Sequence, residues 1–230
     1  MHKSMNKYFP VFVLPTLIAF FVSFCIPFIL GILLSFTKFR VLELDLIEWV
    51  GFDNYKFLLE DEAFLGAIKT SVFFTIASVI TVNVVAFGLA ILLTGKIIGT
   101  NFCRTLFFMP NLIGGVVLGY IWQLLLNAII DVLGNWGILE GHTLLFKGEY
   151  GIWGLVVLVT WQLAGYMMII YIAGIQNIPL ELVEAAKIDG ATRGQILKKV
   201  TIPMIMPSIT ICMFLIVSNS FKLFDQNLTL

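Results

Sequence analysis

Five stretches of the chain are apolar over nearly their whole length, and polar segments of unequal length separate them. A helix needs about 20 mostly apolar residues to cross the hydrocarbon core of a bilayer. Helices are the expected form, because each backbone group must be hydrogen-bonded within its own segment and the alternation typical of a membrane barrel is absent from the sequence. The pattern predicts an all-α polytopic membrane protein. The predicted spans are 11–36, 71–94, 105–126, 152–175 and 207–221.

Composition supports this interpretation. Hydrophobic residues make up 60% of the chain and charged residues 12%, against about 45–50% and about 25% in soluble domains. The formal net charge is zero, so the chain is not expected to bind nucleic acid. The first apolar stretch is too long for the core of a signal peptide and has no small-residue cleavage site, so we expect a retained span.

Cysteine and histidine give no indication of a metal site. Cys25, Cys103 and Cys212 lie in or beside apolar stretches and form no C-x-x-C pattern, so we expect small buried thiols. His2 and His142 are isolated in the sequence. No metal or catalytic group is therefore predicted.

Charge differs between alternate polar segments. With the N-terminus in the cytoplasm, most lysines and arginines fall in the inside segments and most acidic residues fall outside. Positive charge favours the cytoplasmic side. We therefore expect a cytoplasmic N-terminus and a cytoplasmic loop over 176–206.

This loop is predicted to contain two short helices. Leu182, Ala185 and Ile188 recur at three-residue spacing and form one apolar face. Gly190 follows Asp189 and is suited to the positive φ that often ends a helix. Proline at position 179 suits the start of the first helix.

The second helix of the loop has a sequence-level start signal. Thr192 and Gln195 form a T-x-x-Q capping box. Proline is unfavourable inside a helix, so we expect this helix to end before Pro203.

The same loop resembles a known motif. E-A-A from Glu184, three residues, Gly190, nine residues and then V-T-I-P is similar to the EAA loop of bacterial ABC importer permeases. That pattern normally ends in I-x-L-P, and Val200 and Ile202 are conservative departures. EAAKIDGAT followed by Gln195 resembles carbohydrate-uptake permeases in particular, as do WVGFDNYKFLLEDEAF and RTLFFMPNLIGGVVLGYIWQLLLN. The chain looks like the first permease of maltose or glycerol-phosphate type systems.

The resemblance implies a fold and partners. It implies the type I ABC importer transmembrane fold in a single domain, 1–230, with five of six expected spans visible, so we expect a chain truncated at its C-terminus. It implies a prokaryotic cytoplasmic membrane, a heterodimer with a second permease, two ATPase subunits, an extracytoplasmic solute-binding protein, a sugar cargo and contact with lipid. No cofactor is expected in this chain. ATP and Mg²⁺ would reside on the ATPase, since the sequence has no G-x-x-x-x-G-K-[ST] motif.

The resemblance also implies site residues. The EAA loop would dock into a cleft of the ATPase, and the chain itself would be a transport subunit rather than an enzyme. The residues implied in coupling are Glu184, Ala185, Ala186, Asp189 and Gly190.

Polar residues inside spans are costly and often functional. The candidates for the substrate path are Gln162, Tyr166, Ser218, Asn219 and Ser220. Tyr166 and Asn219 fall at or near sugar-contacting positions of the resembled family. Each could instead bond a neighbouring helix, and for the other three we favour that alternative. Asn83 is expected to make an interhelical bond, Asn111 after Pro110 to mark a kink, and Gly115 and Gly119 to permit close helix packing.

Other functions fit less well. A secondary transporter would need its own coupling-ion site, and no Asp or Glu lies well inside a predicted span. A membrane enzyme would need a catalytic cluster there. A glycerol-phosphate or polyol cargo is a narrower alternative, and Lys222 is the only cation near the predicted path that would favour a phosphate.

Overall fold

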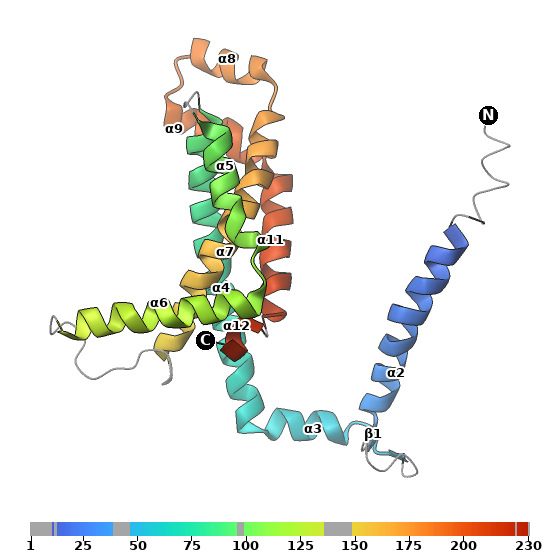
Figure 1. Cartoon of the computed structure of the whole chain (residues 1–230). Coiled ribbons are helices and arrows are strands. Elements are labelled where there is room, and N and C mark those ends of the chain that lie inside the picture. The colour runs from blue at the N-terminus through green and yellow to red at the C-terminus, as the bar shows by residue number, and fades with distance from the viewer. Residues whose placement is uncertain are drawn as a thin grey trace. The chain divides into compact units, whose positions relative to one another are not determined.

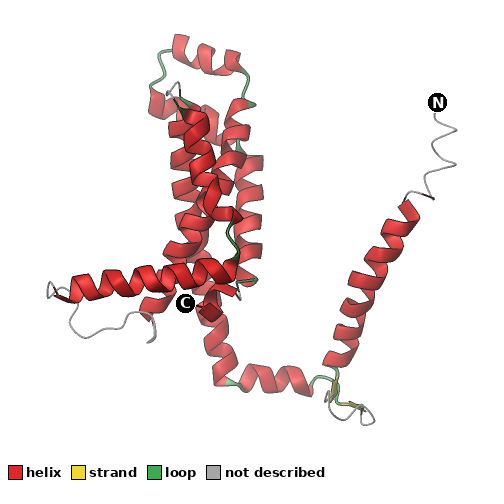
Figure 2. Ribbon diagram, viewed as in Figure 1, coloured by secondary structure: helices red, strands yellow, loops and turns green. Residues whose placement is uncertain are grey.

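The structure is a computed structural model of the 230-residue chain. It describes residues 11, 13–38, 47–95, 99–135, 149–223 and 225–229. Contacts divide the chain into two compact units, 1–68 and 69–230, and each is treated by itself. Helices make up almost all of the described chain (Figures 1 and 2).

The first unit contains one apolar helix, Val13–Ser35. It includes a π-helical turn, η1 (Phe21–Cys25), and α2 (Ile26–Ser35), which has proline in its first turn. The N–H of Ile26 donates to Phe21 O in π-helical spacing, as is typical where proline withholds a donor. The most apolar 18-residue stretch of this helix is not covered by other described residues.

A short hairpin and a surface helix follow in this unit. Strands β1 (Thr37–Lys38) and β2 (Glu48–Trp49) pair antiparallel. Helix α3 (Asp53–Glu60) comes next, with Phe52 at its N-cap position. Asp53 Oδ1 lies 3.2 Å from Lys56 Nζ on the exposed surface.

The second unit is a helical bundle. Its core is made by α4, α7 and α11, whose fully buried side chains include Val82, Met167, Tyr171, Cys212 and Ile216. The bounds of the helices, in chain order, are α4 (Glu62–Thr94), α5 (Thr100–Phe108), η2 (Met109–Leu112), α6 (Gly115–Asn135), α7 (Glu149–Gln176), α8 (Leu180–Ile188), α9 (Arg193–Ile196), η3 (Leu197–Thr201), α10 (Ile202–Met204), α11 (Met206–Phe221) and α12 (Asp225–Thr229).

Membrane-spanning capacity agrees with the all-α prediction. Four described helices are long and apolar enough to cross a bilayer, and a fifth span is present if the bent α5–α6 pair counts as one. The three described cysteines, Cys25, Cys103 and Cys212, are free thiols, and Cys212 is fully buried.

The predicted span over 105–126 is sharply bent in the structure. Helices α5–η2 and α6 meet at 101°. The expected kink is present: Pro110 lies in the 3₁₀ turn η2, and Ile113 is extended, with φ −80° and ψ 129°. Helix α12 packs against the start of α6 at this bend, so closely that a Cβ at Gly115 would lie 3.0 Å from Asp225 Cβ. Gly115 therefore permits close packing, as expected, against α12.

The prediction that the second loop helix ends before Pro203 was wrong. The helix passes from α9 through the π-helical turn η3 into α10, which ends at Met204. Pro203 lies inside this continuous helix, directly after the π-helical turn, a local adjustment that commonly accompanies proline in a helix. In η3 the N–H of Ile202 donates to Leu197 O, so the helix continues by wider spacing.

Candidate coupling segment and cargo path

Helix α8 begins the segment that sequence analysis singled out. Pro179 is its N-cap, and the N–H of Leu182 donates to Pro179 O at 3.2 Å. Glu181 lies in its first turn and Lys187 in its last. Both charges complement the helix dipole. The sequence thus favours a short helix with defined ends.

The apolar face of α8 is open. Leu182 is 43% exposed and Ile188 is 86% exposed, and Ala185 between them is also exposed. Figure 1 shows α8 across one end of the second unit. An Ile side chain this exposed leaves apolar area uncovered, and α8 makes its main contact with the short helix α9. The face is therefore available to a partner.

The end of α8 is closed by a Schellman motif. Gly190 has φ +77°, a conformation that a side chain would strain. The N–H of Ala191 donates to Ala186 O at 2.9 Å, and that of Gly190 to Lys187 O at 3.1 Å. The predicted helix end is confirmed, and its hydrogen bonds stiffen the turn that follows.

The capping box is also confirmed. The N–H of Thr192 donates to Gln195 Oε1 at 2.7 Å, and the N–H of Gln195 donates to Thr192 Oγ1 at 3.4 Å. A cavity of about 330 Å³ lies between the two helices, with Asp189, Gln195 and Lys199 in its wall. The segment is thus a pair of capped helices rather than a loose loop.

The five predicted coupling residues lie on two sides of α8. Glu184, Ala185, Asp189 and Gly190 are exposed, and Ala186 is half-buried. Ala186, Asp189 and Gly190 line the 330 Å³ cavity. Ala185 lies on the open apolar face, next in sequence to the Glu184 carboxylate.

The predicted path residues are not all brought together. Gln162 is buried, and its Oε1 accepts from Gln226 Nε2 of α12 at 3.2 Å. The half-buried ring of Tyr166 packs edge-on against Phe108, with centroids 6.4 Å apart. Asn219 is exposed, and its Nδ2 donates to Leu215 O of its own helix at 2.8 Å. No hydrogen bond joins Tyr166 to Asn219 in the part of the chain that the structure describes.

The two serines differ from each other. Ser218 is half-buried. Ser220 is 7% exposed, and among the described residues its Oγ has no hydrogen-bond partner. A buried hydroxyl without a partner is costly, so Ser220 is a polar group that a ligand or a further helix could satisfy.

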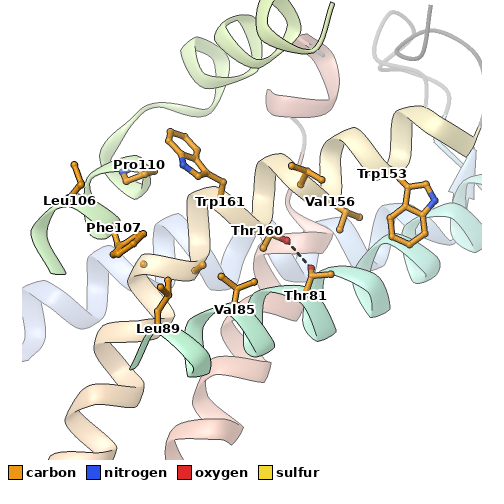
Figure 3. Close-up of a pocket in the computed structure, with 13 residues that line it drawn as sticks. Thr81, Val85, Leu89, Leu106, Phe107, Pro110, Trp153, Val156, Thr160 and Trp161 are labelled. Atoms are coloured by element: carbon orange, nitrogen blue, oxygen red, sulfur yellow. Dashed lines mark hydrogen bonds between the residues drawn. The ribbon is translucent and has the colours of Figure 1, made fainter. Parts of the chain in front are cut away.

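A larger cavity, of about 700 Å³, lies between α4, α5 and α7 (Figure 3). Its hydroxyls already have partners: Thr81 Oγ1 lies 2.8 Å from Thr160 Oγ1 and donates to its own helix at Ala77 O, 3.0 Å away. Most other lining residues are apolar, including Trp153 and Trp161. Such a wall offers little to a hydrophilic cargo.

Helix α7 separates this cavity from the predicted path. Its cavity-lining residues recur at 153, 156, 157, 160, 161 and 164, which is one helical face. Gln162 is two residues from both Thr160 and Ala164, so it lies on the opposite face. Sequence analysis missed this cavity, because it depends on residues of three helices far apart in the chain.

Comparison with known proteins agrees with these features. Residues 94–230 match the family described as binding-protein-dependent transport system inner membrane component. The probable starch degradation products transport system permease protein AmyD of Thermoanaerobacterium thermosulfurigenes is 42% identical over 223 residues, covering 96% of this chain and 75% of AmyD. The multiple sugar-binding transport system permease protein MsmF of Streptococcus mutans serotype c is 31% identical over 227 residues, covering 97% of this chain and 78% of MsmF.

A solved structure supports the fold. The crystal structure of a bacterial ABC transporter involved in the import of the acidic polysaccharide alginate contains a chain that matches with a TM-score of 0.79 and 24% identity. The match covers 98% of this chain and 81% of that one. Together with the family match and the AmyD identity, this confirms the resemblance seen in the EAA loop. The chain belongs to the binding-protein-dependent transport system inner membrane components, the permease subunits of ABC importers.

Proposed function

We propose that the chain translocates a sugar or oligosaccharide and is driven by ATP hydrolysis on a separate subunit. The names of AmyD and MsmF support a carbohydrate cargo. So does the chemistry of the candidate path, where Gln162, Tyr166 and Ser220 supply amide, phenol and hydroxyl groups. Such groups bind sugar hydroxyls, and an aromatic ring can stack on the apolar face of a sugar.

The open apolar face of α8 carries the coupling part of the proposal. Leu182, Ala185 and Ile188 lie on a helix whose end is closed by Gly190. A rigid helix between two spans can transmit a displacement, whereas a flexible loop would absorb it. We infer that this face docks on the ATPase subunit, with Glu184 offering a carboxylate to a basic side chain there and the small Ala185 and Ala186 permitting close approach.

The partners follow from this role. We infer a second permease subunit, two ATPase subunits that hold ATP and Mg²⁺, and an extracytoplasmic solute-binding protein. The family description, which refers to binding-protein-dependent transport in the inner membrane, supports the last of these. The positive charge of the segment around α9, from Arg193, Lys198 and Lys199, supports a cytoplasmic position for it and hence a cytoplasmic N-terminus.

The test is ATP hydrolysis by the complex in lipid vesicles. The chain is purified with the products of its neighbouring reading frames, and hydrolysis and uptake are measured with and without candidate sugars and the binding protein. We expect stimulation by one carbohydrate class and its loss in Glu184→Lys. Glu60→Lys, a charge reversal on the exposed helix α3, is the matched control and should retain stimulation.

Two results would overturn parts of the proposal. Normal coupled uptake by Glu184→Lys would remove this carboxylate from the coupling role. Stimulation by glycerol phosphate or another polyol, and by no sugar, would replace the cargo while leaving the importer role in place.

A further inference from the structure

The two spans that flank the coupling segment touch through a glycine. Gly174 lies in the last turn of α7, and Ser208 lies in the first turn of α11. A Cβ at Gly174 would overlap Ser208 Oγ and would lie 3.1 Å from Ser208 Cβ and 3.5 Å from Ile205 Cγ2. The α7 backbone therefore rests directly on the α11 side chain, and only glycine fits there without displacement.

The contact continues along both helices. Cys212 Sγ donates to Met167 O at 3.9 Å, and Ile205, Met167 and Cys212 are each at most 1% exposed. Packed interiors transmit displacement because they cannot be compressed. The α7–α11 contact thus begins at Gly174 and Ser208, at the base of the coupling segment, and extends into the core.

Helix α8, in contrast, is joined to these two spans by the chain segments that precede and follow it. One segment runs through Ile178 and Pro179 into α7, and the other runs through α9, η3 and α10 into α11. A displacement of α8 reaches the spans by these two routes. The routes meet where Gly174 contacts Ser208.

We propose that Gly174 is a positioning residue for energy coupling. By letting α7 and α11 touch at the base of the segment, it makes the two spans move as one body when α8 is displaced. A methyl group at this position displaces the Ser208 side chain and loosens the contact, so part of the motion of α8 is absorbed between the two helices. This inference rests on the proposed function, in which α8 receives its motion from an ATPase.

Gly174→Ala tests the contact, and Gly88→Ala is its matched control. Gly88 is also a glycine within a span, but a Cβ there would meet no heavy atom within 4 Å. The readout is cargo taken up per ATP hydrolysed by the complete complex in vesicles. We expect a fall of about tenfold in Gly174→Ala, in the range of mutations along a coupling route, and no change in Gly88→Ala.

A compensating substitution separates positioning from general misfolding. Ser208→Gly removes the atoms that the new Cβ would overlap, so Gly174→Ala combined with Ser208→Gly should recover uptake per ATP. Coupling in Gly174→Ala equal to that in Gly88→Ala would overturn the inference. So would a loss of assembly or coupling in Gly174→Ala that Ser208→Gly fails to reverse. If the unmodified complex shows no cargo-dependent hydrolysis, the proposed function has failed instead.

Discussion

Tyr171 of α7 donates its hydroxyl hydrogen to Asn83 Oδ1 of α4, and Asn83 Nδ2 donates to Val79 O of its own helix at 2.6 Å. Asn83 thus has a partner for its amide oxygen and one for its amide nitrogen inside an apolar span. The interhelical bond expected for this residue is confirmed. It joins two apolar helices, and a polar group that loses its partner inside a bilayer is costly.

Removing that hydroxyl should destabilise the permease modestly. Tyr171→Phe leaves Asn83 Oδ1 without its interhelical donor, and we expect a loss of about 0.5–1.5 kcal/mol, the range for interhelical bonds in membranes. Thermal denaturation of the purified chain in detergent measures the change. Tyr120→Phe is the control, because Tyr120 is 56% exposed. Equal stability of the two variants would show that the Tyr171–Asn83 bond contributes nothing.

The end of α8 should depend on glycine at position 190. Gly190→Ala forces a side chain into φ +77°, at a cost of about 1–2 kcal/mol. We expect weaker assembly with the ATPase and reduced cargo-stimulated hydrolysis. Gly194→Ala is the control in the same segment, since a Cβ there meets no heavy atom within 4 Å. Full coupling in Gly190→Ala would mean that the geometry of this turn is not needed.

The open face of α8 should carry docking energy. Ile188→Ser removes the most exposed apolar side chain of that face, and buried anchors of interfaces typically contribute about 2 kcal/mol or more. We expect the ATPase subunit to bind at least about tenfold more weakly in a titration with labelled subunit. Lys187→Ala alters a neighbouring residue outside the 182–185–188 face and should have a smaller effect. The reverse order would place the interface on another side of α8.

Substitution of Gln162 distinguishes the two roles considered for the path residues, which are contact with the cargo and hydrogen bonding to a neighbouring helix. If cargo passes this side of α7, Gln162→Leu should lower uptake at saturating binding protein by about tenfold, because a sugar hydroxyl loses its partner. Thr160→Val, on the opposite face, should leave uptake close to normal, since Thr81 keeps its bond to Ala77 O. A Gln162→Leu variant that transports normally but is less stable would assign the residue to the bond with Gln226 alone.

Local motifs were the most predictable part of this protein. The Schellman end at Gly190 and the capping box of Thr192 and Gln195 depend on bonds between residues close in sequence, so their signals can be read from a few letters. The prediction for the second loop helix was too short, because it rested only on proline being unfavourable inside a helix. The π-helical turn before Pro203 is an adjustment of several residues, which no single letter marks.

Contacts between distant segments were not predictable. The partner of Asn83 is Tyr171, and the partner of Gln162 is Gln226. A polar residue in a span indicates that a partner exists, but the bond is made by whichever residue the packing brings near. The contact of Gly174 with Ser208 is of the same kind.

The sequence by itself determined that the chain is a helical membrane protein, where four of its five apolar stretches form helices, and that a capped pair of short helices interrupts them, because hydrophobic length and helix caps are local quantities. Only the tertiary structure decided the 101° corner between α5 and α6, the two opposite faces of α7 and the contact of α7 with α11. These features arise from packing between segments far apart in the chain, where close approach and side-chain volume determine which arrangement is stable.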